Sequence, residues 1–170
     1  MKRQVKTQQY FFTLNLIVGA QALALATFAL VVLLIESPSQ PMDPEQASLF
    51  QYMAIGLLIA GLVLSQLVPK QIIGKVSPSL PFKQRVPKYF TMVIFRIACL
   101  EMPGLFVCAI AFISGQTMYV YAVPLLLLVF YLYRPRKEEL IELLKLTPDE
   151  SKQLDDPNAI ISEFEYTERN

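Results

Sequence analysis

Histidine is absent from all 170 residues, and cysteine occurs only twice. Without imidazole, the chain has no histidine ligand for haem or a metal ion and no histidine proton relay. Cys99 and Cys108 share one apolar stretch and would lie about 13 Å apart along a helix. That separation excludes a disulfide between them, and two lone thiols make a poor metal site. We interpret both as small packing residues and expect no metal and no cofactor.

Catalytic sequence motifs are missing as well. The chain has no G-x-S-x-G, no H-E-x-x-H, no P-loop and no Rossmann fingerprint, so we do not expect an enzyme. Charged residues make up only 17% of the chain and hydrophobic residues 54%, which is typical of a membrane protein. A chain of this length leaves no room for a soluble catalytic domain beside the apolar part.

Four apolar segments cover residues 10–35, 49–68, 89–114 and 117–133. The second has no charge and the ~20 residues that cross a hydrocarbon core of ~30 Å. The first and third are longer and are expected to tilt, and the short fourth has tyrosines at both ends, as interfacial anchors do. The first segment imitates a secretory signal, but its apolar run continues far past a signal core, so we expect an uncleaved helix. The pattern predicts an all-α integral membrane protein in which residues 1–134 form four transmembrane helices, arranged as two antiparallel hairpins.

Basic residues occur in alternate connectors. They are found before the first segment, between the second and third, and after the fourth, whereas the other two connectors contain no base. By the positive-inside rule, both termini are expected in the cytoplasm. The four prolines of the basic connector predict an irregular segment at the membrane surface. The basic residues of this connector either only fix the membrane topology or also bind anionic lipid. They are Lys70, Lys75, Lys83, Arg85 and Lys88.

Residues 135–170 are predicted to form a short cytoplasmic amphipathic helix followed by an acidic tail. The helix is expected at the interface or against the basic connector. In "TPDE", Thr147 is the expected N-cap, Pro148 the first helical residue and Glu150 the closing residue of a capping box. The tail is expected to be mobile, either resting on the connector's bases or solvated without a specific role.

Small residues are frequent in the first two apolar segments, where they permit close approach of helix backbones. They predict close packing of these two helices on one another, or on helices of a neighbouring chain. The residues are Gly19, Ala20, Ala22, Ala24, Ala26, Ala29, Ala54, Gly56, Ala60 and Gly61.

Glu101 is the deep acid of the third segment, about 18 Å along the helix from its cytoplasmic edge. An ionised carboxylate at that depth costs at least ~2.5 kcal/mol, so the group is expected to be protonated, paired or wetted. Arg96 lies close enough to the edge to extend its side chain outwards, and the two residues are not natural partners within one helix. Pro103 leaves the carbonyl group of residue 99 without its helical donor, and a protonated Glu101 can donate to that carbonyl, to Gln21 or to Asn15.

A resemblance appears in the stretch "FRIACLEMPGLFVCAIAFISGQ" and in the later "RPRKEELIELLKLTPDE". Over residues 85–150 the chain resembles an uncharacterised family of small bacterial four-helix inner-membrane proteins. In that family the third helix carries arginine, alanine and then glutamate, and the fourth ends in arginine-proline. The resemblance implies a bacterial inner membrane and no assigned activity.

The stretch "ACLEMPGLFVCAIAF" is also similar to the carboxylate-bearing helix of the c subunits of rotary ATP synthases. That likeness implies that Glu101 binds a proton or cation. The chain departs from it in having a long proline-rich connector, Arg96 near the acid, an additional helix on each side, and only Gly56 and Gly61 in the helix that would pack inside a ring.

Two hypotheses therefore follow. In the first, the chain is a non-catalytic accessory or scaffold component of a membrane assembly, and Arg96 and Glu101 serve helix packing. In the second, it is an oligomeric protein that handles protons or cations through Glu101. Its expected partners are the lipid bilayer and either further copies of itself or other membrane subunits, and no nucleic acid.

Overall fold

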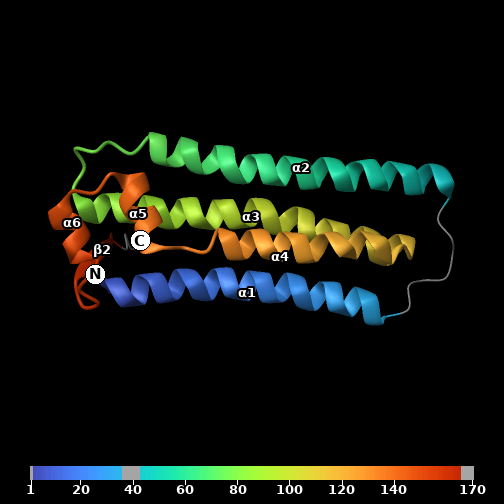
Figure 1. The fold of residues 1–170 in the computed structure, drawn as a ribbon, viewed down its shortest axis with the longest axis horizontal. Helices are drawn as coiled ribbons and strands as arrows, with labels where there is room; N and C mark the ends of the chain where they lie inside the picture. Colours follow the sequence, from blue (N-terminus) through green and yellow to red (C-terminus); the bar gives the residue numbers. More distant parts are fainter. Residues whose placement is uncertain (1, 36–42, 166–170) are drawn as a thin grey trace, which may run out of the picture.

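The computed structural model describes residues 2–35 and 43–165, which are mostly helical (Figure 1). Three long helices, α1 (Thr7–Leu34), α2 (Pro44–Gly74) and α3 (Phe82–Ser114), run along the bundle. A 3-10 helix, η1 (Thr117–Tyr121), leads into the shorter α4 (Ala122–Leu132). The chain then forms α5 (Lys137–Leu144) and α6 (Pro148–Gln153), and strands β1 (Lys2–Lys6) and β2 (Ile160–Glu165) pair with each other.

The long helices account for the predicted apolar segments. By length and composition, α1, α2 and α3 can each cross a membrane, and residues 117–132, which continue into α5 through a bend of 68°, are a fourth candidate. The fourth segment is not α-helical throughout, because it begins as η1. Pro124 lies in the first turn of α4, where its missing N–H has no helical partner to lose.

The helices are longer than the sequence suggested. We expected the proline-rich connector of residues 69–88 to be irregular, and that prediction was wrong over most of its length. Helix α2 continues through Pro69, and α3 begins at Phe82 and continues through Pro87. Each proline removes only one backbone donor, and the packing of buried neighbours such as Val86 holds the helix together around it. The irregular part is limited to residues 75–81.

Helix α3 is the centre of the bundle (Figure 1). Helix α2 packs on one side of α3, and α1 packs on α3 and α4. The predicted packing of the first two helices on each other was therefore wrong, since α3 separates α1 from α2 in the part of the chain that the structure describes. Gly61 instead serves the α2–α3 contact, because a Cβ atom there would lie 2.5 Å from the carbonyl oxygen of Cys99. This is the carbonyl that Pro103 deprives of its helical donor.

Residues 134–165, here called the C-terminal segment, fold back onto the end of the bundle where α1 begins. Strands β1 and β2 are antiparallel, with Lys2 opposite Glu165 and Val5 opposite Ser162. The first N–H groups of α1 have no acceptor within the helix, and this segment supplies one. The N–H of Thr7 donates to the carbonyl of Ala159 over 3.0 Å. Residues 160–165 of the predicted acidic tail form strand β2, and residues 166–170 lie outside the described part.

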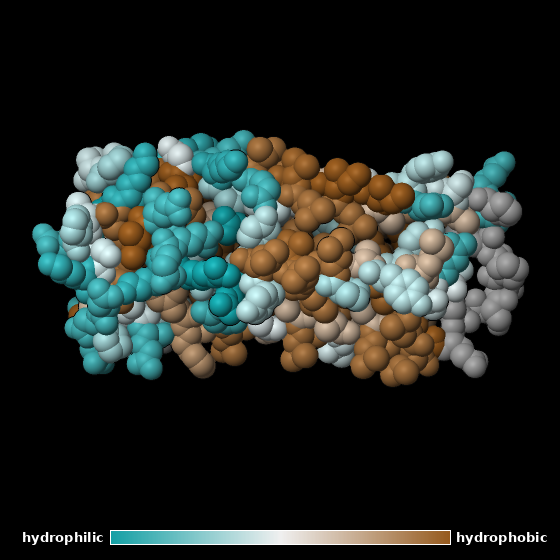
Figure 2. Space-filling view, viewed as in Figure 1, coloured by the Kyte–Doolittle hydropathy of each residue, from teal (hydrophilic) through white to brown (hydrophobic). Residues whose placement is uncertain are grey.

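The surface separates by polarity along the bundle. Figure 2 shows hydrophobic side chains over the middle of the molecule, and hydrophilic side chains gathered at the end that holds the C-terminal segment. Large hydrophobic side chains are exposed on all four apolar helices, including Leu23, Ile59, Phe95 and Leu125. This is the surface expected of helices that face lipid.

Candidate functional site

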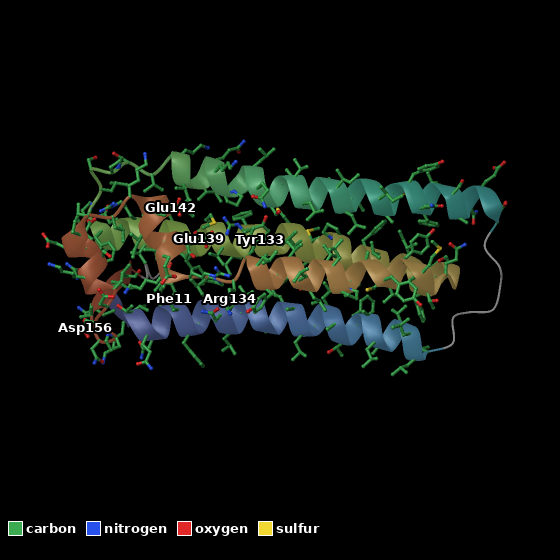
Figure 3. All side chains as sticks on the ribbon, in the orientation of Figure 1. Phe11, Tyr133, Arg134, Glu139, Glu142 and Asp156 are labelled. Atoms are coloured by element: carbon green, nitrogen blue, oxygen red, sulfur yellow. The ribbon has the colours of Figure 1, made fainter. Side chains whose placement is uncertain are left out.

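A polar cluster around the buried Arg96 lies where α4 ends. Arg96 of α3 has a side chain that is 10% exposed, and its Nη1 lies 2.5 Å from Oε1 of Glu139 on α5. The hydroxyl of Tyr89 donates to the other carboxylate oxygen of Glu139 over 2.8 Å. The guanidinium carbon of Arg96 lies 5.1 Å from the ring centre of Tyr133. Figure 3 shows Glu139 and Tyr133 close together over α3.

The path of the chain after α4 places these groups. Helix α4 ends at Leu132, Tyr133 follows, and residues 134–136 connect to α5 across the 68° bend. Leu140 and Leu144 of α5 are buried against the bundle, which turns Glu139 towards α3. Gln66 of α2 adds a fourth element, because its side-chain amide donates to the hydroxyl of Tyr133. We call Arg96, Glu139, Tyr89, Tyr133 and Gln66 the Arg96 cluster.

A second buried arginine ties α3 to the C-terminal segment. The side chain of Arg85 is 4% exposed, donates from Nη1 to the carbonyl of Leu144 over 2.9 Å and forms an ion pair with Glu150. The predicted capping box is confirmed, with Thr147 as N-cap and Glu150 as its partner. Partial burial favours the neutral form of Glu150, but the backbone N–H of Thr147 and the guanidinium of Arg85 outweigh it, so the pKa of Glu150 lies below its ordinary value.

The connector's bases separate into two groups. Arg85 was one of five candidates for contact with anionic lipid, but its side chain is buried in the ion pair described above. The remaining candidates are exposed, and they are Lys70, Lys75, Lys83 and Lys88. Two of them, Lys75 and Lys88, line a cavity of about 240 Å³ between the end of α2 and the start of α3.

Glu101 lies five residues beyond Arg96 on α3 and is half-buried. Within the described residues its carboxylate makes no hydrogen bond or ion pair, and Arg96 is directed to Glu139 instead. Asn15 is exposed and donates to the carbonyl of Phe11 in its own helix over 2.9 Å. Of the residues predicted to support Glu101, Pro103 lies against Gly61, and Arg96 is paired with Glu139.

Gln21 lies at the same level as Glu101. A Cβ atom on Gly104 would lie 2.9 Å from a methyl group of Leu25, which sets the register between the parallel helices α1 and α3. Gln21 and Glu101 each precede that contact by about one turn. The side-chain oxygen of Gln21 is buried and has no hydrogen-bond partner among the described atoms. This amide oxygen is an acceptor that a protonated carboxyl group can satisfy.

The described residues contain no group of three or more cysteine, aspartate or glutamate side chains placed to hold a metal ion. Comparison with protein-family models, with curated proteins and with solved structures finds no match to this chain. The chemistry of the site therefore rests on its own geometry.

Proposed function

We propose that the chain is a multi-pass protein of a bacterial inner membrane, with both termini in the cytoplasm. We further propose that it acts as a non-catalytic accessory or scaffold component of a membrane assembly, either with copies of itself or with other membrane subunits.

The helix lengths support this position in a bilayer. The 19 residues of α3 from Arg96 to Ser114 span about 27 Å of helix, close to the ~30 Å hydrocarbon core. Tyr133, at the end of α4, contacts Arg96 and so lies at the same level. Arg96 then marks the cytoplasmic boundary, and the first 14 residues of α3, from Phe82 to Phe95, project beyond it. This boundary places Glu101 about 7.5 Å inside the core.

The observation that carries the scaffold proposal is the ion pair between Arg96 and Glu139. Both charges are partnered and largely removed from water, and they join a membrane helix to the C-terminal segment. Arg85 and Glu150 repeat the arrangement further out along α3. Buried pairs of this kind hold one packing arrangement against alternatives, and they present the folded end of the bundle as one surface.

Reporter fusions test the topology. Alkaline phosphatase fused after residue 170 is expected to be inactive and green fluorescent protein there to be fluorescent, whereas phosphatase placed at residue 40 should be active. The protein should also remain in the membrane after carbonate extraction. An active phosphatase after residue 170 overturns the orientation, and release by carbonate overturns membrane insertion itself.

Native electrophoresis of membranes solubilised in digitonin tests the scaffold role. The chain is expected in an assembly larger than its own 19.3 kDa monomer with bound detergent. A chain that migrates only as a monomer, when extracted at its natural expression level, contradicts the role in an assembly.

Proton or cation handling is the second candidate. The unpartnered Glu101, at the same level of the bundle as the buried oxygen of Gln21, favours it. Glu101→Gln retains shape and hydrogen bonding but cannot ionise. If the purified protein moves protons or Na⁺ in proteoliposomes, and Glu101→Gln abolishes that flux while the exposed Glu142→Gln does not, the scaffold proposal is replaced by this one. Absence of flux in the unmodified protein removes the second candidate.

A further inference from the structure

A groove runs between α2 and α3, and its cytoplasmic end is basic. The cavity of about 240 Å³ described above is lined by Lys75 and Lys88, the hydroxyl-bearing Thr91 and the apolar side chains of Ile72, Val76 and Leu80. Neither lysine is paired with an acid within the described residues, and the sequence contains no acid between Glu45 and Glu101. Two free ammonium groups beside apolar side chains suit a ligand that is anionic at one end only.

The membrane part of the groove is apolar. A second cavity of about 280 Å³ lies between Leu57–Leu64 of α2 and Cys99–Phe106 of α3. Its floor is the close contact of Gly61 with the backbone of Cys99 and the ring of Pro103. Because Gly61 has no side chain, the groove is open above that contact.

Helical spacing places both cavities on the same side of the helix pair. On α3, Thr91 of the first cavity and Met102 of the second are eleven residues apart, which is almost three full turns. On α2, Ile72 of the first cavity and Gly61 of the second are also eleven residues apart. Residues at this interval share one helix face, so both cavities lie on the same side of the α2–α3 pair, along the groove between these helices. From Thr91 to Met102 the groove extends about 16 Å along α3.

We propose that this groove binds one anionic phospholipid, with its phosphate between Lys75 and Lys88 and an acyl chain along the apolar cavity past Gly61. The inference rests on the membrane position proposed above. With the core boundary at Arg96, the Cα atom of Thr91 lies about 7.5 Å outside it and that of Lys88 about 12 Å outside it. The headgroup layer is about 5–7.5 Å deep, so the Lys88 side chain has to extend towards the membrane. Lysine ammonium groups extend from aliphatic stems to reach that layer. A free phosphate ion would use the lysines but would leave the apolar cavity unused.

Native mass spectrometry of the full chain in detergent tests the lipid site. Dioleoylphosphatidylglycerol and dioleoylphosphatidylcholine are titrated separately, and inorganic phosphate is added as a competitor in a third arm. We expect one phosphatidylglycerol to bind at least tenfold more tightly than phosphatidylcholine. At roughly a fivefold contribution per lysine, the double variant Lys75→Gln/Lys88→Gln should weaken that binding about 25-fold.

Two control variants separate this site from general charge and hydrophobicity. Lys70→Gln/Lys145→Gln removes the same charge from exposed positions outside the groove and should leave binding unchanged. Ala60→Leu fills the apolar cavity and should weaken lipid binding, whereas Ala24→Leu on the exposed face of α1 should not.

Equal affinity for the two lipids overturns the proposal, and so does an equal loss in both lysine double variants. Displacement of the lipid by millimolar phosphate, with no effect of Ala60→Leu, identifies a free phosphate site and also overturns it. The reporter fusions and carbonate extraction are independent of lipid binding, so a membrane protein that fails the titration disproves this inference alone.

Discussion

Replacing Glu139 with glutamine should release the C-terminal segment from the bundle. The change leaves the guanidinium of Arg96 with a neutral partner at a position where its side chain is 10% exposed. Removing one member of a fully buried ion pair costs about 3–5 kcal/mol. Glu139 is 26% exposed, and Arg96 retains its contact with the ring of Tyr133, so we expect a smaller loss of about 2 kcal/mol. That loss corresponds to a roughly 30-fold larger population of the released segment.

Limited proteolysis measures this population. In inside-out vesicles, the cleavage rate after Lys145 and Lys152 should rise about 30-fold in the Glu139→Gln protein, provided that opening is fast relative to cleavage. Glu142→Gln is the matched control, because Glu142 lies on the same helix with an exposed side chain. Equal cleavage rates in the two variants would refute the assignment of the Arg96–Glu139 pair as the tie that holds the segment.

Three further predictions concern packing and pH. Gly61→Ala should separate α2 from α3 and lower the unfolding midpoint in detergent, at a cost of about 1–3 kcal/mol. Gly56→Ala should have little effect, because no atom lies within 4 Å of the added carbon. Because the pKa of Glu150 is depressed, its stabilisation is present above the ordinary value of 4.5 and is lost as pH falls below it. Cleavage of the C-terminal segment should therefore rise in acid, and Glu150→Gln should flatten that rise while the exposed Asp149→Asn should not. Tyr10→Phe removes a 2.8 Å hydrogen bond to α3 and should cost about 1 kcal/mol in thermal unfolding; an unchanged midpoint would show that this bond is not net stabilising.

Local signals in the sequence were sufficient for the helices and for one cap. Apolar runs of membrane length predicted the four helical segments, because such a run is stable only when its backbone bonds are satisfied internally. The "TPDE" cap depends on four consecutive residues, and the structure confirms it. The prolines were poor indicators of helix ends, since Pro69 and Pro87 are tolerated inside helices that tertiary packing holds in place.

Long-range contacts were beyond the sequence. Arg96 and Glu139 are separated by 43 residues, and no periodicity in either helix identifies the pair. A weak signal existed, because Glu139 lies next to the apolar face of its helix, where an acid requires a partner. The pairing of β1 with β2 had no such signal, since each strand is short and its partner lies at the other end of the chain. Both features depend on how α3 positions its neighbours.

The pairing of β1 with β2 has a consequence for biosynthesis. Residues 2–6 are synthesised before residues 160–165, their partners in the sheet, and all of the helices lie between the two strands. Until residues 160–165 have been made, β1 therefore has no partner, and the first turn of α1 lacks the carbonyl of Ala159 that bonds it. Closure of this end of the bundle therefore follows the synthesis of residue 165, and a chain arrested before residue 160 leaves β1 unpaired.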